Sequence, residues 1–405
     1  MDRIINLSAF IGRILHRNSS ILTDDIIQNK QKLAKEIDGK NIMVIGGAGT
    51  IGGSFIKALL RNGTPAQLVV VDINENGLTE IIRDIRSSSD LNIPPNILTY
   101  PVNFSDPVFE KILRRYGRFD VVANFAAHKH VRSEKDELSI EAMVHNNVLK
   151  ARDLLDKLLK EPPAHFFCVS TDKAANPVNI MGASKKLMED VIMAYSEKIK
   201  ITTARFANVA FSNGSLPFGF MERLQKRQPF SAPKDVRRFF VSPEESGEIC
   251  MIACLLGASG DIFFPKLDEV NDMYTFTYVA DELLKELGLK PVYCQSEEEA
   301  RQMASKLNAN SSEYPVYYFA SDTSGEKPYE EFYTSSEVIN LDAFGKLGII
   351  KETPRKSLAE LDGVIQRLEA VFQTQTTKAE IVHVLKDYLP DFQHIETGKS
   401  LDQKM

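Results

Sequence analysis

Short apolar runs alternate with amphipathic segments of helical length from residue 41 onward. The four clearest runs span residues 42–45, 68–71, 121–125 and 166–170. A run that is apolar at every position is buried on both faces, which is typical of strands in a parallel sheet covered by helices on either side. The alternation therefore predicts an α/β fold built on a doubly wound parallel sheet, the Rossmann arrangement.

The pattern changes before and after this region. Residues 1–40 read as helical, and the apolar residues between Ile4 and Leu15 recur at helical spacing. Such a stripe indicates packing on the body of the protein or on a second subunit more often than on a membrane surface. After residue 208 the alternation loosens into loops with Gly and Pro, followed by a helical stretch over 357–389. We therefore expect an N-terminal helical appendage over 1–40, the parallel-sheet domain over 41–207, a smaller substrate-binding lobe with C-terminal helices over 208–390, and a flexible tail over 391–405.

The composition is that of an ordinary globular protein. Of 405 residues, 43% are hydrophobic and 26% are charged, and the net charge of −6 disfavours nucleic acid as a partner. The four cysteines cannot form a disulfide framework, and Cys250 and Cys254 lack the spacing of a zinc site, so we expect no metal and a reducing, cytoplasmic location. The first fifteen residues mix charges into their apolar positions, which predicts neither a signal peptide nor an integral membrane anchor.

A glycine turn follows the first predicted strand. Gly46, Gly49 and Gly52 stand at the junction of strand and helix, where glycine lets the backbone turn sharply and approach a pyrophosphate. Asp72 ends the second predicted strand, where a carboxylate accepts hydrogen bonds from the adenosine ribose and repels a 2′-phosphate. The alternative is a structural turn followed by an ordinary aspartate at a strand end. The combination favours NAD over NADP as cofactor.

Chargeable residues follow the fourth predicted strand, at the carboxyl edge where doubly wound sheets bind their ligands. Thr171, Asp172 and Lys173 lie there, and the segment from Met181 to Lys185 opens the next helix. An isolated pair of this kind is usually a solvated ion pair at a strand end. Beside a cofactor turn, an acid next to an amine indicates proton transfer.

One segment is specific to a family. Residues 170–185, which read STDKAANPVNIMGASK, resemble the signature of the nucleotide-sugar 4,6-dehydratases of polysaccharide biosynthesis, a branch of the extended short-chain dehydrogenase/reductase superfamily. Four further blocks agree in order and spacing, at residues 126–131, 147–148, 205–209 and 325–332, so the resemblance covers about residues 41–350. Within this family the chain looks most like the soluble N-acetylglucosamine-nucleotide dehydratases of legionaminic-acid-type pathways. The resemblance implies bound NAD and a sugar-nucleotide substrate, UDP- or GDP-N-acetylglucosamine.

The resemblance also implies roles for the catalytic residues. The family's usual tyrosine is replaced by Met181, which cannot take a proton. In relatives that also carry methionine there, the Asp and Lys of the triplet do the proton work. In the implied cycle a hydride passes from sugar carbon 4 to NAD, a proton leaves carbon 5, water is lost across carbons 5 and 6, and the hydride returns to carbon 6. Lys173 is then the candidate base at carbon 5, a role that burial and nearby positive charge would help if they lowered its pKa. Asp172 is the acid for the leaving hydroxyl, Thr171 bonds the carbon-4 oxygen, and Lys185 bonds the nicotinamide ribose.

The remaining site residues are expected contacts of the two ligands. For NAD they are Gly46, Gly49, Thr50, Ile51, Gly52, Asp72, Asn103, Phe104, Ala126 and Lys185; for the sugar nucleotide they are Lys129, Asn208, Ser215, Arg238 and Glu326. Arg238 reads equally well as part of a solvated basic face. Relatives often carry an arginine at the position of Thr323, and its loss leaves UDP versus GDP open.

Two other functions stay open. A nucleotide-sugar 4-epimerase uses the same fold and cofactor but needs no acid and base at carbons 5 and 6. A non-catalytic dinucleotide-binding sensor or scaffold would have no use for the triplet from Thr171 to Lys173, although Met181 lends weight to this alternative. We also expect a homo-oligomer, because the central helices of such folds often pair across a two-fold axis and the apolar stripe from Ile4 to Leu15 offers further surface.

Overall fold

A nine-stranded sheet forms the centre of the larger lobe. The computed structural model describes residues 5–322, 324–327, 329–374 and 376–398. The strands run in the order β14 (Val338–Asn340), β15 (Leu347–Lys351), β10 (Ile262–Pro265), β6 (Ile201–Ala204), β5 (His165–Val169), β4 (Val121–Asn124), β1 (Asn41–Ile45), β2 (Gln67–Asp72) and β3 (Asn96–Pro101). All neighbours from β10 to β3 are parallel, whereas β15 is antiparallel to both of its neighbours. The predicted α/β fold with a doubly wound parallel sheet is confirmed.

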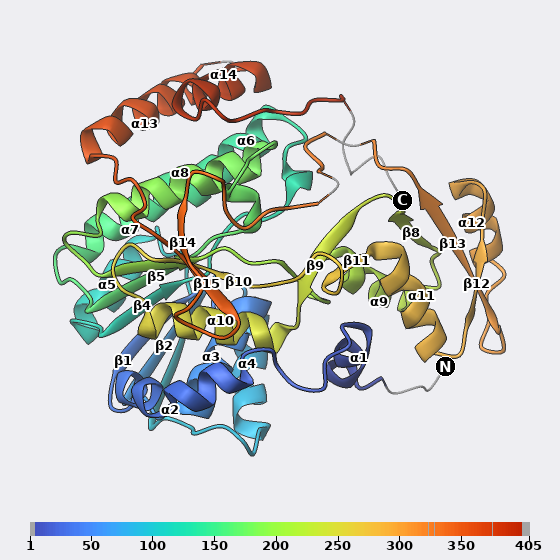
Figure 1. Cartoon of the computed structure of the whole chain (residues 1–405), viewed down its shortest axis with the longest axis horizontal. Coiled ribbons are helices and arrows are strands. Elements are labelled where there is room, and N and C mark those ends of the chain that lie inside the picture. Colours follow the sequence, from blue (N-terminus) through green and yellow to red (C-terminus); the bar gives the residue numbers. More distant parts are fainter. Residues whose placement is uncertain (1–4, 323, 328, 375, 399–405) are drawn as a thin grey trace.

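Helices cover both faces of this sheet (Figure 1), which is why its strands are apolar at successive positions. Met43 and Val44 point to opposite faces, and both are fully buried. The helices that pack on the sheet are α3 (Thr50–Asn62), α4 (Glu75–Ser87) and α10 (Pro243–Leu256) on one face, and α5 (Pro107–Tyr116), α7 (Lys150–Leu158) and α8 (Ile180–Ala194) on the other. The direction of the strand order reverses between β1 and β4, and such a reversal is where open α/β sheets bind ligands.

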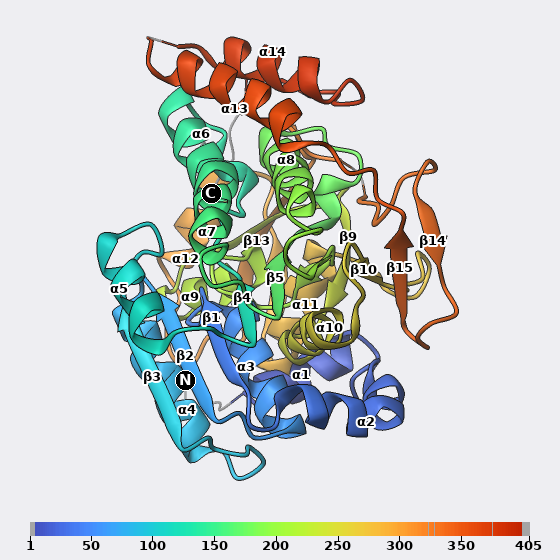
Figure 2. The same cartoon turned by 90° about the vertical axis from the view of Figure 1, so that its left-hand side faces the viewer.

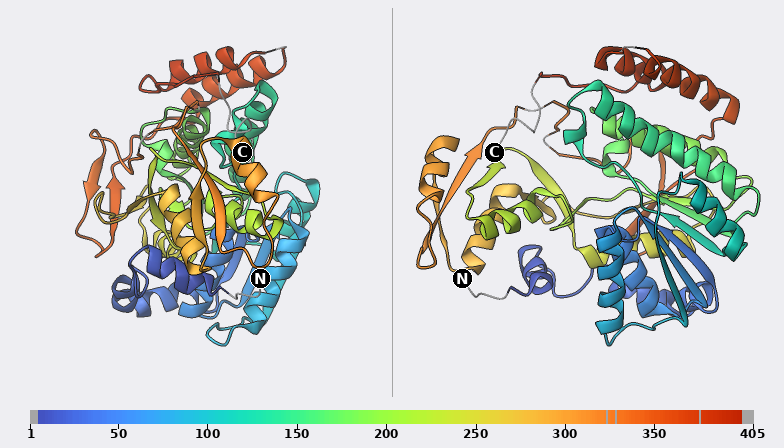
Figure 3. Two further views of the ribbon diagram at one scale, coloured as in Figure 1. Left: turned by 90° about the vertical axis from the view of Figure 1, so that its right-hand side faces the viewer. Right: turned by 180° about the vertical axis from the view of Figure 1, so that it is seen from behind.

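The smaller lobe stands at the carboxyl edge of the sheet, where residues 170–173 follow β5 (Figure 3). It holds two three-stranded sheets, β12–β13–β8 and β11–β9–β7. Their strands are β7 (Asn208–Val209), β8 (Phe230–Pro233), β9 (Arg237–Val241), β11 (Met273–Thr275), β12 (Lys290–Tyr293) and β13 (Glu313–Phe319). Its helices are α9 (Leu216–Lys226), α11 (Phe276–Glu286) and α12 (Glu297–Ala304). Its core is separate from that of the larger lobe, as a second hydrophobic cluster shows.

The chain passes between the lobes more often than a single boundary at residue 208 describes. After β7 to β9 it returns to the larger lobe to form α10 and β10, and it returns again for β14 and β15. The N-terminal 40 residues are also divided. Helix α1 (Leu7–Ile14) buries Phe10 and Ile11 in the core of the smaller lobe, whereas α2 (Thr23–Ile37) buries Leu33 and Ile37 in the core of the larger one.

A C-terminal helical hairpin covers the helices above the sheet (Figure 2). The predicted helical stretch over 357–389 is two helices, α13 (Leu358–Phe372) and α14 (Lys378–Tyr388), each begun by a capping box. Leu361 and Leu368 are buried on the inner side of α13, and the hydroxyl of Tyr388 donates to Asp190 Oδ2 on α8 at 2.9 Å. The hairpin therefore lies on the central helices of the larger lobe.

This chain itself covers part of the surface on which the expected homo-oligomer rests. The hairpin lies over α8. Of the apolar stripe, Phe10, Ile11, Ile14 and Leu15 are buried in the smaller lobe, Ile5 and Leu7 are partly buried against the same core, and Ile4 lies outside the described residues. A homo-oligomer stays a prediction. Among the residues that the structure describes, no helix is both long enough and apolar enough to cross a membrane.

Candidate active site

The glycine turn joins β1 to α3, and its geometry admits no side chain at Gly46 or Gly52. Gly46 has a φ of +78°, and a Cβ there would lie 2.6 Å from the amide nitrogen of Ala126, just beyond β4. A Cβ on Gly52 would lie 2.3 Å from the carbonyl oxygen of Gly46. Three predicted contact residues, Gly46, Gly52 and Ala126, thus meet at the strand-order reversal. Gly49, Thr50 and Ile51 complete the turn and begin α3.

Asp72 is held beside this turn. Its Oδ2 accepts from the amide of Ala48 at 3.0 Å, and its Oδ1 accepts from the amide of Asn74 at 2.9 Å. A carboxylate has about four acceptor positions, so both oxygens can still accept from a ribose. Asn103 and Phe104 follow β3, but Asn103 accepts from the Ser105 amide and hydroxyl, and Phe104 is 4% exposed. The turn and Asp72 fit a dinucleotide, whereas Asn103 and Phe104 are engaged in local structure.

Asp172 and Lys173 form a buried ion pair directly after β5. Lys173 Nζ donates to Asp172 Oδ1 at 3.0 Å, and Thr171 Oγ1 donates to the same oxygen at 2.8 Å. Asp172 is 3% exposed and the side chain of Lys173 is 15% exposed. Glu330, from the segment after β13, places Oε1 3.7 Å from Lys173 Nζ and is 4% exposed. Two carboxylates from different parts of the chain therefore flank one amine.

The charges around Lys173 contradict one expectation. Burial alone would lower the pKa of Lys173, but the neighbouring carboxylates of Asp172 and Glu330 outweigh it, and the pKa is raised. The lowered pKa that would help Lys173 to act as a base is therefore not found, because two carboxylates lie beside the amine. Burial also raises the pKa of Glu330, although Lys173 acts in the opposite direction.

Met181 and Lys185 lie in the first turns of α8. Asn179 caps this helix by accepting from the amide of Gly182 at 2.7 Å, and the amide of Met181 donates to Glu134 Oε1 at 2.9 Å. Lys185 Nζ donates to the carbonyl of Val169, the last residue of β5, at 2.7 Å. Burial lowers the pKa of Lys185. The helix thus holds an ammonium group behind the strand that ends in the catalytic segment.

The predicted substrate contacts fall into two groups. Arg238 and Glu326 come together in the smaller lobe, with Arg238 Nη2 3.4 Å from Glu326 Oε1 and Arg238 Nη1 donating to the carbonyl of Lys327 at 2.9 Å. Arg238 is 5% exposed, so it is no part of a solvated face. Asn208 begins β7 and is half-buried.

The second group is the loop that precedes α9. Ser215 caps α9 by accepting from the amide of Phe218 at 3.3 Å. Lys129 Nζ donates to the carbonyl of Asn213 at 3.0 Å, and the amide of Asn213 donates to Thr50 Oγ1 at 2.9 Å. This loop therefore bridges the start of α3 and the segment after β4. Ser215 has a structural role in this arrangement.

A basic hollow adjoins Lys129. It has a volume of about 370 Å³ and is lined by His128, His130, Arg132, Ser133, Lys135, Ser139 and Ala142. Burial lowers the pKa of Lys129, and it does the same for His130. The lining offers hydrogen-bond donors to an anionic or hydroxylated ligand. No group of three or more His, Cys, Asp or Glu side chains within the described ranges is arranged to hold a metal ion.

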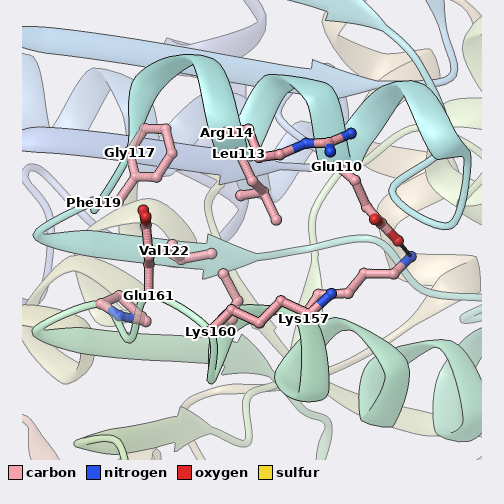
Figure 4. Close-up of a pocket in the computed structure, with 11 residues that line it drawn as sticks. Glu110, Leu113, Arg114, Gly117, Phe119, Val122, Lys157, Lys160 and Glu161 are labelled. Carbon is pink, nitrogen blue, oxygen red and sulfur yellow. Dashed lines mark ion pairs between the residues drawn. The ribbon is translucent and has the colours of Figure 1, made fainter.

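A second pocket lies away from these residues (Figure 4). It has a volume of about 200 Å³ and lies between α5, β4 and α7. Its lining includes Leu113, Phe119 and Val122, but none of the residues predicted for the site. Because Val122 stands near the amino end of β4, this pocket faces the opposite edge of the sheet from the catalytic segment.

Sequence reasoning missed the C-terminal segment that reaches the site. Residues 391–398, expected to be a flexible tail, contact the body of the protein at a few points although most of them are exposed, and residues 399–405 lie outside the described ones. Phe392 is 2% exposed, the amide of Ile395 donates to the carbonyl of Val178 at 3.0 Å, and the amide of Gly325 donates to the carbonyl of Ile395 at 2.9 Å. His394 Nε2 lies 3.6 Å from Glu134 Oε2. The segment ties the catalytic loop to the block that carries Glu326.

The family described as polysaccharide biosynthesis protein matches residues 42–352. An uncharacterized membrane protein of Methanocaldococcus jannaschii is 29% identical over 79% of this chain and 88% of its own length. A UDP-N-acetylglucosamine 4,6-dehydratase (inverting) of Campylobacter jejuni is 24% identical over 76% of this chain and 89% of its own length. A UDP-glucose 4-epimerase of Rickettsia felis is 26% identical over 76% of this chain and 81% of its own length. The chain spans about half of two longer relatives, from Bacillus subtilis and Staphylococcus aureus.

Solved structures share the fold. The X-ray structure of Pen from Bacillus thuringiensis aligns with a TM-score of 0.60 at 20% identity, covering 79% of this chain and 90% of the other. The dTDP-glucose 4,6-dehydratase DesIV from Streptomyces venezuelae, solved with NAD bound, aligns with a TM-score of 0.55 at 18% identity. The alignment covers 83% of this chain and 98% of the other. The predicted resemblance to nucleotide-sugar 4,6-dehydratases is confirmed by these relatives and by the family match.

Proposed function

The chain belongs to the polysaccharide biosynthesis protein family, and on that premise we propose that it is an NAD-dependent nucleotide-sugar 4,6-dehydratase. The substrate we propose is UDP- or GDP-N-acetylglucosamine, and the product is the 4-keto-6-deoxy sugar nucleotide. The observation that carries the proposal is the buried Asp172–Lys173 pair at the carboxyl end of β5. A reaction that moves protons at two neighbouring carbons needs an acid and a base at one place.

NAD would be held by the glycine turn, by Asp72 and by Lys185. When bound, NAD would supply the hydride acceptor for carbon 4 and the hydride donor for carbon 6. Gly46 and Gly52 leave the backbone free to approach the pyrophosphate, which the amino end of α3 attracts. Asp72 would accept from the adenosine ribose, and Lys185 would bond the nicotinamide ribose, for which its ammonium would give up its bond to Val169.

Asp172 and Lys173 would divide the proton transfers between them. Asp172 takes the proton of the carbon-4 hydroxyl, because Met181 offers no group that can, and later gives it to the hydroxyl that leaves carbon 6. Lys173 removes the proton at carbon 5 and returns one there after the double bond is reduced. Thr171 already donates to Asp172, and it would bond the carbon-4 oxygen.

The sugar nucleotide would bind between the lobes. Arg238 would contact the diphosphate, since it is close enough to Lys173 to act on its charge, and Glu326 would bind the substrate beside it. Lys129 and Asn208 would contact the sugar or the diphosphate. We propose that the product enters bacterial surface-glycan or nonulosonic acid synthesis, of the legionaminic type, and that the enzyme acts in the cytoplasm.

A 4-epimerase is the second candidate, because UDP-glucose 4-epimerases are among the relatives. The two reactions differ in product mass. The purified protein would be incubated with UDP- or GDP-N-acetylglucosamine, and the product would be weighed by mass spectrometry. Loss of one water supports the dehydratase, an isomer of unchanged mass supports the epimerase, and no conversion of either substrate contradicts both. NADH that accumulates in step with product would contradict the return of the hydride to the same sugar.

A further inference from the structure

A carboxylate from the segment after β13 stands next to the catalytic amine. Glu330 is 4% exposed, and its Oε1 lies 3.7 Å from Lys173 Nζ, less than 1 Å beyond hydrogen-bond length. No part of the proposed proton transfers uses it so far. We propose that Glu330 accepts the proton that Lys173 carries at rest, and so frees the amine to act as the base at carbon 5. This inference rests on the proposed function.

The starting charge of Lys173 creates the need for such an acceptor. With carboxylates on two sides, Lys173 is held as an ammonium ion, and an ammonium ion has no lone pair with which to take a proton. Before carbon 5 can lose its proton, one proton must leave Nζ. Among the residues that the structure describes, Asp172, at 3.0 Å, and Glu330, at 3.7 Å, lie close enough to receive it.

The two carboxylates differ in the hydrogen bonds that they accept. Oδ1 of Asp172 accepts from Thr171 Oγ1 at 2.8 Å, from the amide of Lys173 at 2.9 Å and from Lys173 Nζ at 3.0 Å. Three donors already occupy this oxygen, and Asp172 is also the group proposed to take the carbon-4 hydroxyl proton. Glu330 Oε1 lies 3.7 Å from Nζ, so a side-chain movement of less than 1 Å brings the two atoms within hydrogen-bond length, and burial raises the pKa of Glu330. Glu330 is therefore the better acceptor.

The proton balance of the cycle closes. An N–H bond of Lys173 breaks and an O–H bond forms on Glu330, which leaves a neutral amine and a neutral acid. The carbon-5 proton then binds the amine, and its electron pair stays on the sugar next to the carbon-4 ketone. After the double bond between carbons 5 and 6 is reduced, the amine returns a proton to carbon 5 and recovers the one on Glu330. Asp172 handles the other proton, from the carbon-4 hydroxyl to the departing water.

The chain provides a matched control in the next residue. The carboxylate of Glu331 accepts from Asn176 Nδ2 at 2.9 Å, lies 3.7 Å from Lys327 Nζ, and is 47% exposed. Glu330→Gln keeps the size of the side chain but cannot accept a proton. Glu331→Gln makes the same chemical change outside the buried cluster. Glu330→Asp keeps the carboxylate and serves if the glutamine variant does not fold.

The experiment compares these variants with the full-length wild type. We expect Glu330→Gln to lose about 100-fold or more in kcat, with little change in KM, and to lose deuterium exchange at carbon 5 in deuterated water. Reduction of the bound nicotinamide, followed by its near-ultraviolet absorbance, should persist, because it precedes the carbon-5 step. Glu331→Gln should stay within about twofold of wild type, and Glu330→Asp should recover part of the exchange.

The pH profile gives an independent readout. The charged groups that act on Glu330 are Lys173, Asp172, Arg238 and Lys327. Because Glu330 must be ionised to accept a proton, the rate of the wild type should fall as the pH drops through its ionisation, and this fall should be absent in Glu330→Gln. The proposal would be overturned if Glu330→Gln and Glu331→Gln had the same kcat and the same deuterium exchange at carbon 5. It would also be overturned if Glu330→Gln lost nicotinamide reduction to the same extent as deuterium exchange. A wild type that releases no water would overturn the proposed function instead, and this inference with it.

Discussion

Gly52→Ala would test whether the glycine turn is the cofactor site. The added Cβ would lie 2.3 Å from the carbonyl oxygen of Gly46 and 2.9 Å from the Cα of Gly47. Both are backbone atoms, so neither can rotate away. Ordinary contact begins at 3.4 Å, and the turn must therefore open by about 1 Å at the place where the backbone would approach the pyrophosphate.

Gly53→Ala is the matched control. Its Cβ would lie 3.3 Å from Cδ1 of Ile81, the far end of a side chain, which can give by the few tenths of an ångström required. Both glycines are in α3, so the helix preference of alanine over glycine, up to about 1 kcal/mol, favours both variants alike. The difference between them therefore isolates the clash. We expect Gly52→Ala to be less stable than Gly53→Ala by about 1–3 kcal/mol.

The assay combines urea unfolding with a calorimetric titration of NAD. Gly53→Ala should bind NAD like the wild type. Gly52→Ala should bind it about 10- to 100-fold more weakly, since each factor of ten corresponds to about 1.4 kcal/mol of lost contact. If Gly52→Ala unfolds at a lower urea concentration yet binds NAD within about twofold of Gly53→Ala, the turn contributes to the fold alone and NAD binds elsewhere.

Four further outcomes follow from the site and its surroundings. Asp72→Ala should relax discrimination against NADP, and an unchanged preference, measured by titration with both cofactors, would place Asp72 away from the ribose. Lys173→Met should retain nicotinamide reduction but lose about 100- to 10,000-fold in turnover together with deuterium exchange at carbon 5, and normal exchange would refute its role as base. Arg205 is fully buried between Glu189 and Glu337. Arg205→Met should therefore lower the free energy of unfolding by about 3–5 kcal/mol, and a loss below about 1 kcal/mol would contradict a role of this ion pair in stability. Burial raises the pKa of Glu248 to about 7, above the 4.5 of the unfolded chain. The stability that Glu248 contributes is therefore complete below pH 4.5 and is lost as the pH rises through 7. Unfolding curves at pH 5 and pH 8 should show that Glu248→Gln gains more stability over the wild type at pH 8 than at pH 5.

The cofactor turn and the catalytic segment were predictable because each is a local pattern. Gly46, Gly52 and Asp72 take their places from a strand, a turn and the next strand, which together span only about thirty residues. Thr171, Asp172 and Lys173 follow a fully buried strand, and the carboxyl end of such a strand is where ligands bind. Neither prediction needed to know which distant segments pack nearby.

Glu330 and the C-terminal segment were not predictable in this way. Glu330 stood in a block recognised by resemblance, yet nothing in the sequence said that its carboxylate meets Lys173. The direction of the pKa shift of Lys173 could not be predicted without it, since a pKa depends on every charge within a few ångströms, whatever its position in the chain. His394 likewise meets Glu134 from a segment that reads as a polar tail.

The sequence alone determined the parallel sheet, the glycine turn and the position of Thr171, Asp172 and Lys173 after β5. An apolar run or stripe states that an element is buried, because that much follows from the side chains themselves. The run or stripe does not show which part of the protein the element packs against. The tertiary structure decided that α1 joins the smaller lobe while α2 joins the larger, that the chain returns to the sheet after residue 208, and that α13 and α14 cover α8. Hydrophobic burial is not directional, so shape and the remaining chain select the partner of each apolar face.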